Sequence, residues 1–581
     1  MSALQRNGRN GELRSSTALG RIAAAVAVTL GITFVVLTLG GVARGWHPMP
    51  TSAMWDGYLG FWFRLVDGDT AAWWAQQGGS RLVLPRVLFW TDLKFFAGSG
   101  WFLIACNLVL VAGIALALVV ALRARLIEVR GSIDPRDGFV LTGAVIVTMV
   151  VAWMQSRNLL WGFQTKVFLS VLVPLVAFIV LGRSEGVRLD RPRRSTALFW
   201  IAWGLTVLSV GTSASGLLIP VLATAMSLLQ RTSWKRPLIL AITSVACIVV
   251  YGIGYVVPTN QAGSWDALVQ SPVRAGQFLL AYLSGPVYYG TESRWFGLVS
   301  GAAFMVLVVA FFVHEVRSRP RSGTGLAMVN FAVYVTVLAV VTTPGGLRYG
   351  PDEAYASRYQ TPMLVAWASL LVLAAPRIQG AIGRGASWVP VALVAIPIVL
   401  IPQQLKASTD QAANHRARDV AALAIALGVP DGKVIAALSD DPELAVALGR
   451  RAMESGLTVL GTKPYVDLIS DLGTTAPIRP PVACTGFVDT ATAISGSELA
   501  RVTGWVAPAA PLAPANAILD VLDPHGTIVG YVVSGLPRPD VAALVSGTPE
   551  NPGFIGYVAP GLDVRTLSLS GPDGTCSTPL R

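Results

Sequence analysis

The feature that most constrains the fold of this chain is a series of long apolar runs in its first 400 residues. Runs of about 18 or more apolar residues are typical of helices that span a membrane. We expect eleven such spans, at 20–42, 101–122, 138–155, 167–182, 196–211, 214–230, 237–257, 295–314, 326–343, 361–376 and 387–402. The composition agrees with this prediction, because 53% of the residues are hydrophobic and only 13% are charged.

The character of the sequence changes after Pro402, where charged residues return and the apolar runs become shorter. We therefore predict a polytopic α-helical membrane protein with a C-terminal domain outside the membrane. The expected parts are an N-terminal tail (1–19), a transmembrane domain (20–402), an α/β segment (403–479) and a β-sandwich-like domain (480–581).

The positive charge of the chain is concentrated in the membrane domain. Residues 1–402 contain 32 Lys and Arg against 15 Asp and Glu, whereas residues 403–581 contain 12 against 17. Alternate loops such as "GRSEGVRLDRPRRS" and "HEVRSRPRSG" are dense in arginine, and the positive-inside rule places them in the cytoplasm. The N-terminus is then cytoplasmic, and an odd number of spans places the C-terminal domain outside. Because topology explains the basic excess, we expect a lipid bilayer and no nucleic acid as a partner.

The C-terminal part has both helical and strand-like patterns. Helical spacing of apolar residues occurs in "DQAANHRARDVAALAIALGV" and in "DPELAVALGRRAMESG", where Asp441 and Pro442 suit a helix start. The runs "KVIAAL" and "LTVLG", which stand before and after the second of these helices, predict strands. From residue 480 onward alternating patterns predict a β-sandwich, with "DPHG" as a hairpin turn.

The four cysteines fall into two groups. Cys106 and Cys247 lie within predicted spans and are expected to be packing residues. Cys484 and Cys576 lie in the exported domain, where an oxidising environment permits a disulfide between them. No spacing of cysteine and histidine resembles a zinc site.

Polar residues gather in the loops that face outward. The first external segment, 43–100, is rich in tryptophan and phenylalanine and contains Asp56, which follows Trp55. A carboxylate held against an apolar interface has a tunable pKa and suits a general base, while a helix N-cap is the alternative role for Asp56. Later external loops are "SRNLLWGFQTK", the segment 258–294, which we expect to hold a re-entrant or interfacial helix, and "LRYGPDEAYASRYQTP".

Candidate ligand-binding residues lie in these loops. Arg358 with Tyr359 suits a lipid phosphate, because a guanidinium forms bidentate bonds to phosphate, and Arg348 is a second candidate clamp. Amides and aromatic rings suit a sugar, which makes Asn158, Trp161 and Gln164 candidates. The structural alternatives are interfacial belts for the aromatic residues, snorkelling anchors for the arginines and solvated turns for Asp352 and Glu353.

The plan resembles the GT-C class of membrane glycosyltransferases. It is most similar to bacterial multi-span proteins marked by segments that here read "SRLVLPRVLFWTDL" (80–93), "NLLWGFQ" (158–164) and "ASRYQT" (356–361). Gly79 and Ser80 stand where an acid–histidine pair is expected, and "WDG" offers one carboxylate where several GT-C families have two.

The resemblance implies an enzyme of the bacterial cytoplasmic membrane that takes a sugar from a polyprenyl-phosphate carrier. Asp56 would act as the base on the hydroxyl of a glycan acceptor. Arg358, Tyr359, Arg348 and Arg81 would bind the lipid phosphate. Asn158, Trp161, Gln164 and Trp55 would bind sugar or acceptor. The leaving phosphate would be stabilised by arginine or by a divalent metal, and the sequence defines no metal ligands.

Other functions remain open at this point. A polysaccharide polymerase or ligase acting on lipid-diphosphate-linked glycan would depend on the external arginines and little on Asp56. A transporter would have ionisable residues deep within its spans and internal repeats. A scaffold that displays the exported domain would leave the polar loops without a role. In that domain Trp505, Tyr531 and Tyr557 could stack on sugars or form the core of the sandwich.

Overall fold

The computed structural model describes residues 2–131, 138–188, 190–230, 233–258, 270–319, 321–512, 518–544 and 551–580, with the backbone alone for residues 2–17. The chain packs into two units. The helical unit consists of Met1–Arg44, Trp73–Val87 and Leu103–Thr409, and the mixed unit of Gly45–Ala72, Leu88–Phe102 and Asp410–Arg581. The first external segment is thus divided between the two units.

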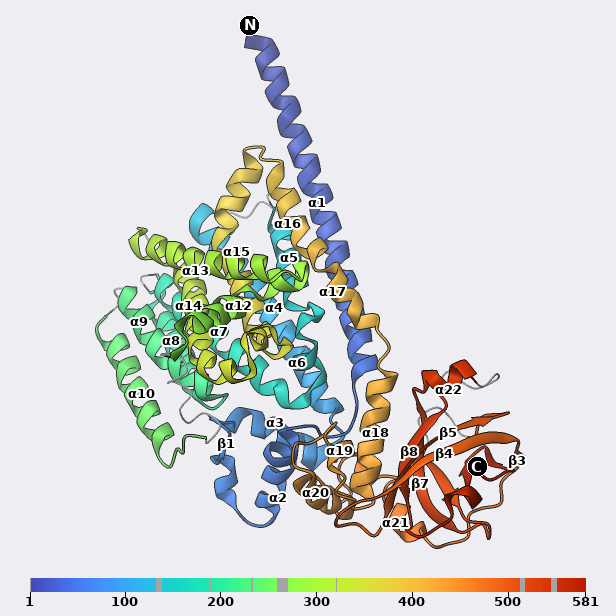
Figure 1. Cartoon of the computed structure of the whole chain (residues 1–581). Coiled ribbons are helices and arrows are strands. Elements are labelled where there is room, and N and C mark those ends of the chain that lie inside the picture. Colours follow the sequence, from blue (N-terminus) through green and yellow to red (C-terminus); the bar gives the residue numbers. More distant parts are fainter. Residues whose placement is uncertain are drawn as a thin grey trace. The chain divides into compact units, whose positions relative to one another are not determined.

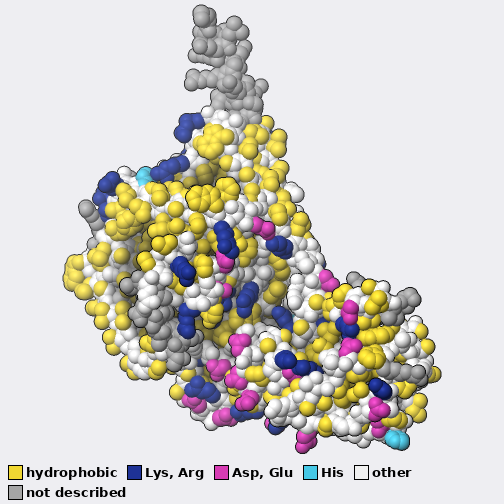
Figure 2. Space-filling model, viewed as in Figure 1, with side chains coloured by type: hydrophobic (Ala, Val, Ile, Leu, Met, Phe, Trp, Pro, Cys, Tyr) yellow, Lys and Arg dark blue, Asp and Glu magenta, His cyan; other side chains and the backbone are white. Residues whose placement is uncertain are grey.

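Nine helices within the described residues are long and apolar enough to cross a membrane. They occupy Ala18–Gly45, Trp101–Arg130, Val140–Leu160, Gly162–Gly186, Lys235–Gly252, Arg294–Arg317, Gly323–Tyr349, Ser357–Gly383 and Trp388–Ser408. Large apolar side chains such as Leu116, Val245 and Val306 are exposed on them, as on a surface that faces lipid, and hydrophobic side chains cover much of the helical unit in Figure 2. The fold is that of a polytopic helical membrane protein.

Two of the predicted spans do not reach that length and composition. Residues 196–211 lie in α8 (Pro192–Val210), and residues 214–230 coincide with a shorter apolar helix, Ala214–Leu229. The predicted loop 258–294 contains the helix α12 (Pro272–Thr291), while residues 259–269 of this loop lie outside the described residues.

The elements of the helical unit are shown in Figure 1. Its helices are α1 (Ser2–Gly45), α4 (Trp101–Arg130), α5 (Val140–Val150), α6 (Ser156–Leu160), α7 (Thr165–Gly186), α8, α9 (Leu218–Leu229), α10 (Lys235–Gly252), α12, α13 (Arg294–Arg317), α14 (Gly323–Gly346), α15 (Gln360–Gly383), α16 (Trp388–Val399) and α17 (Ile401–Leu405), with a short hairpin of β1 (Gln76–Gln77) and β2 (Ser80–Arg81).

Close packing at one end of this unit depends on glycine. A Cβ atom on Gly182, near the end of α7, would collide with the backbone of Gly323 at the start of α14, and the reverse also holds. The start of α14 is capped by Ser322, whose hydroxyl accepts a hydrogen bond of 2.8 Å from the amide of Gly325. These contacts hold α7 and α14 together without a side chain between them.

The mixed unit combines helices with one sheet. Its helices are α2 (Phe61–Val66), the end of α3 (Val83–Phe95), α18 (Ala412–Ala426), α19 (Gly432–Ile435), α20 (Pro442–Glu454), α21 (Leu468–Asp471) and α22 (Pro539–Leu544). The strands are β3 (Pro481–Val482), β4 (Cys484–Ala493), β5 (Ala500–Pro508), β6 (Ile518–Leu522), β7 (Ile528–Leu536), β8 (Gly553–Val558), β9 (Ser568–Gly571) and β10 (Gly574–Cys576).

The helix predicted at "DPELAVALGRRAMESG" is present as α20, and it begins where the sequence predicts. Asp441 accepts a hydrogen bond of 3.0 Å from the amide of Leu444, and Pro442 begins the helix. The predicted hairpin is also present, since β6 and β7 pair antiparallel on either side of the turn at 523–526. Gly526 has a φ of 78° there, which a glycine adopts readily.

The predicted strands of the α/β segment are wrong. "KVIAAL" begins inside α19, because Asp431 caps that helix by accepting a hydrogen bond from the amide of Lys433. "LTVLG" ends in a 3₁₀ helix, Val459–Gly461. Periodicity cannot distinguish a buried helical turn from a strand in a run this short. The described residues of 412–471 contain helices and no strand.

The strands form one continuous sheet where the sequence predicts a sandwich. Their order is β3-β10-β9-β6-β7-β8-β5-β4, antiparallel except for the β10–β3 pair. Cys484 at one edge and Cys576 near the other form a disulfide with a Cα–Cα distance of 5.4 Å, so the sheet curls until its two ends meet. Apolar residues from both ends, such as Val482 and Val506, share one core.

Candidate functional site

The segments around "NLLWGFQ" and "SRY" lie side by side in the helical unit. The Nδ2 atom of the buried Asn158 donates hydrogen bonds to the carbonyl of Arg358 (3.1 Å) and to Oγ1 of Thr361 (2.8 Å). Thr361 in turn donates to Oε1 of Gln155 (2.7 Å). Asn158 therefore fixes the backbone that carries Arg358, and the sugar contact predicted for Asn158 stays a prediction.

The side chain of Arg358 forms an ion pair with one carboxylate and lies over one aromatic ring. Its Nη2 lies 2.5 Å from Oε1 of Glu353, and its Cζ lies 5.0 Å from the centre of the Tyr359 ring. About one third of the Arg358 side chain is exposed (33%). Glu353 thus pairs with the arginine predicted to bind phosphate, whereas its neighbour Asp352 pairs with Arg294 at 2.5 Å.

A second cation, Lys166, accompanies Arg358. It lies in the first turn of α7, and its Nζ is 4.4 Å from the centre of the Phe163 ring. Lys166 follows the segment in which Asn158 binds the carbonyl of Arg358. Lys166 has no ion pair with any described residue. Together with Glu353, this group of three charges has an excess of one positive charge.

Tyrosine rings extend the cluster. The rings of Tyr359 and Tyr282 have their centres 5.2 Å apart, and Tyr282, on α12, is almost fully buried. Tyr334 on α14 donates a hydrogen bond to the carbonyl of Ser170, which lies one turn after Lys166 on α7. The O–H of Tyr334 is used by this bond, whereas the partly exposed Tyr359 can donate a hydrogen bond to a phosphate or sugar oxygen.

Three predicted sugar-binding side chains retain unused polar atoms, and one of them is Asn158, whose buried Oδ1 has no hydrogen-bond partner among the described residues. Oε1 of Gln164 and Nε1 of Trp161 are buried and have no hydrogen-bond partner among the described residues. Gln164 itself is only 3% exposed. A buried polar atom without a partner costs free energy, about 1–3 kcal/mol by comparison with other proteins, and a ligand can remove that cost.

The two other predicted phosphate-binding arginines lie in different environments. Arg81 is buried, and its guanidinium donates hydrogen bonds to the carbonyls of Trp74, Tyr251 and Ile253 at 2.7, 3.2 and 2.6 Å. Arg81 therefore joins the loop at Trp74 to the end of α10 by hydrogen bonds, which is a structural role. Arg348 is exposed and has no ion pair with the described residues.

The predicted base and its neighbour lie in the mixed unit. Asp56 is exposed in a π-helical turn, Trp55–Gly60, whose N-cap position is held by Met54 and not by Asp56. Trp55 is 1% exposed, and its indole N–H donates to the carbonyl of Leu438 at 3.1 Å, so the ring belongs to the core and offers no face to a sugar. The buried carboxylate of this region is Asp92 instead, to which Tyr58 donates a hydrogen bond.

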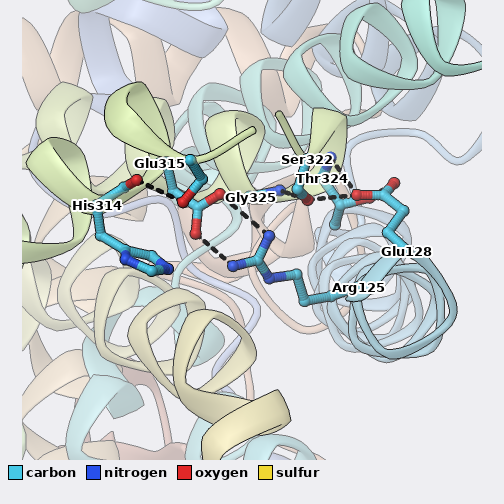
Figure 3. A network of polar contacts seen from close by, with 8 residues as sticks. Arg125, Glu128, His314, Glu315, Ser322, Thr324 and Gly325 are labelled. Carbon is cyan, nitrogen blue, oxygen red and sulfur yellow. Dashed lines mark hydrogen bonds and ion pairs between the residues drawn. The ribbon is translucent and has the colours of Figure 1, made fainter. Parts of the chain in front are cut away.

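The helical unit also contains a buried ion pair that the sequence did not reveal (Figure 3). Nη1 of Arg125 on α4 lies 3.1 Å from Oε2 of Glu315 on α13, and a second bond joins the same groups. Glu128 accepts a hydrogen bond of 2.6 Å from Thr324 at the start of α14. Both residues lie just beyond the predicted spans 101–122 and 295–314, near the ends of α4 and α13. Each charge is the partner of the other, although Nε of Arg125 has no hydrogen-bond partner among the described residues.

Two further expectations concern metal and sugar ligands. Across the described ranges, no three His, Cys, Asp or Glu side chains are grouped so that they could hold a metal ion. In the sheet, Tyr531 and Tyr557 are buried, and Tyr557 donates a hydrogen bond of 3.0 Å to Asp431. These two rings are core residues, while Trp505 is partly exposed.

Sequence reasoning missed Lys166, Tyr282 and the pairing of Glu353 with Arg358. Lys166 carried a detectable signal, because an ionisable residue at the entrance of an apolar span is unusual. The other two depend on contacts between helices that are far apart in the chain. Comparisons of the chain with protein-family models, with curated proteins and with solved structures found no match.

Proposed function

We propose that this protein is a membrane glycosyltransferase that takes a sugar from a polyprenyl-phosphate carrier and transfers it to a glycan of the cell envelope. One observation carries the proposal. Arg358 lies beside the ring of Tyr359 and pairs with the carboxylate of Glu353, and its carbonyl is bound by Asn158, in the segment that leads into Lys166 at the start of α7. An anionic ligand would neutralise the excess positive charge of this group.

A lipid phosphate suits this position for two reasons. Guanidinium and ammonium groups are the usual partners of phosphate, and Arg358 retains donors that Glu353 does not use. The cluster also lies where α7 and α15 begin, so an apolar tail could continue along helices whose side chains are themselves apolar. Gln164 and Trp161 would then offer an acceptor and a donor to the sugar.

The remaining parts of the proposal rest on the sequence. The arginine-dense loops favour an N-terminus in the cytoplasm and a reaction on the outer side of a bacterial cytoplasmic membrane. Asp56, an exposed carboxylate, is the proposed base that deprotonates the acceptor hydroxyl, which then attacks the anomeric carbon as the lipid phosphate leaves. Lys166 and Arg358 would stabilise the charge on that phosphate.

Glycan analysis of a deletion strain tests the proposal. We expect the deletion to remove or shorten one envelope glycan, and the wild-type gene to restore it. Asp56→Ala, Lys166→Ala and Arg358→Ala should fail to restore it. Arg294→Ala is the matched control, since this exposed arginine pairs with Asp352 and lies outside the cluster.

The outcomes separate the function from its site. Unchanged glycans in the deletion strain would exclude the glycosyltransferase. A glycan defect that all three site variants repair would leave the function and discard the site. A defect that Asp56→Ala repairs and Arg358→Ala does not would favour a polymerase or ligase that needs no carboxylate base.

A further inference from the structure

The ion pair between Glu353 and Arg358 is held by side chains on a fixed backbone. Asn158 binds the carbonyl of Arg358, and the amide of Gln360 donates to the carbonyls of Tyr355 and Ala356, both at 3.3 Å. The hydroxyl of Tyr289 also donates to the carbonyl of Tyr355, at 2.7 Å. Glu353 therefore stays beside Arg358 unless a side chain rotates.

The ion pair with Glu353 is made through one nitrogen of the Arg358 guanidinium, and one third of the Arg358 side chain is exposed. Glu353 occupies Nη2 of Arg358, while Nε and Nη1 have no hydrogen-bond partner among the described residues. A phosphate bound there would lie within a few ångströms of the Glu353 carboxylate, because both contact the same planar group. Repulsion between the two anions then grows with the charge of the ligand.

We propose that Glu353 determines which phosphate the site accepts, by favouring a phosphodiester with one negative charge over a diphosphate. The inference rests on the proposed function of the same site. A diphosphate brings further negative charge toward the Glu353 carboxylate, which is paired with the same guanidinium.

Binding of two short lipid analogues to the full-length protein in lipid nanodiscs tests the inference. Farnesyl methyl phosphate is a phosphodiester, and farnesyl diphosphate carries the additional charge on the same tail. For the wild type we expect tighter binding of the phosphodiester. Glu353→Gln keeps the size of the side chain and removes its charge, and should strengthen diphosphate binding about tenfold while it changes phosphodiester binding less than about threefold.

Asp352→Asn is the matched control, because Asp352 is the adjacent acid and pairs with Arg294 instead. It should leave both affinities unchanged. If Glu353→Gln weakens both ligands, or changes both equally, Glu353 only positions Arg358 and the inference is wrong.

Lys166→Gln and Arg358→Gln test the proposed function in the same assay. Both variants should bind the phosphodiester more weakly than the wild type does. If they do not, or if the wild type binds neither analogue, the lipid-phosphate site itself is discarded and the inference with it. If these two variants lose binding and Glu353→Gln affects both ligands equally, the lipid-phosphate site stands and only the inference about Glu353 is wrong.

Discussion

Tyr58 donates a hydrogen bond of 2.5 Å to the carboxylate of Asp92, and both side chains are completely buried in the mixed unit. The other carboxylate oxygen of Asp92, Oδ1, has no hydrogen-bond partner among the described residues. Burial raises the pKa of Asp92 to about 6, although the bond from Tyr58 acts in the opposite direction. Burial and the nearby carboxylate hold the pKa of Tyr58 well above its ordinary value.

The stability of the mixed unit should therefore fall as the pH rises from 4 to 7. The pKa of Asp92 is higher in the folded protein than in the unfolded chain, so its contribution is full below pH 3.8 and is lost as the pH passes 6. The loss is of the order of 3 kcal/mol. Thermal unfolding of Asp92→Asn, followed across this range, should show a flatter pH profile than the wild type.

Asp67→Asn serves as the control for that experiment. Asp67 is an exposed acid of the same unit, and its bond to Arg451 lowers its pKa. Its removal should leave the profile between pH 5 and 7 as it is in the wild type. An unchanged profile in Asp92→Asn would show that Asp92 does not cause the dependence.

Breaking the buried ion pair of the helical unit should be costly. Glu315→Gln leaves the charge of Arg125 without its partner, which typically costs about 3–5 kcal/mol. The double variant Arg125→Met/Glu315→Leu removes both charges and should recover most of the loss. The unfolding temperature of the purified protein measures both effects, and equal destabilisation by the single and double variants would contradict this account.

Asn158→Ala should weaken phosphodiester binding about tenfold, because one or two hydrogen bonds that fix the backbone of Arg358 are lost. Asn330→Ala removes a comparable bond of 3.1 Å to the carbonyl of Leu222 and should leave binding unchanged. The nanodisc binding assay distinguishes the two variants. Equal effects would mean that Asn158 acts through general stability.

Asp431 should be essential for the stability of the mixed unit. It accepts hydrogen bonds from Arg501 at 2.9 Å and from Tyr557 at 3.0 Å, and it caps α19. Asp431→Ala leaves the partly buried guanidinium of Arg501 and the buried hydroxyl of Tyr557 without this partner, which should lower the free energy of unfolding by about 3–5 kcal/mol. Asp540→Asn, in an exposed pair with Arg538, should change the unfolding temperature little.

Patterns that repeat along the chain could be predicted from the sequence. Nine of the expected spans coincide with long apolar helices, since length and composition alone define such helices. The start of α20 and the turn at 523–526 follow from local capping and turn chemistry. The disulfide joins the two cysteines that the sequence paired.

Contacts between distant segments could not be predicted. The approach of Lys166 to Arg358 depends on how α7 packs near α15, and no local pattern encodes that. Arg125 and Glu315 are separated by 190 positions, so nothing in either span identifies the partner. The aromatic residues of the first loop looked like an interfacial belt, yet Trp55 is a core residue because a much later segment covers it.

The mixed unit draws on three segments of the chain, 45–72, 88–102 and 410–581. A ribosome adds the intervening helical unit at about 5–20 residues per second, so the early loop waits roughly 15–60 seconds for the residues that cover it. During that interval Trp55 and Tyr58 lack their native neighbours. A nonsense mutation upstream of residue 438 would therefore leave a region encoded near the beginning of the gene without the residues that cover it.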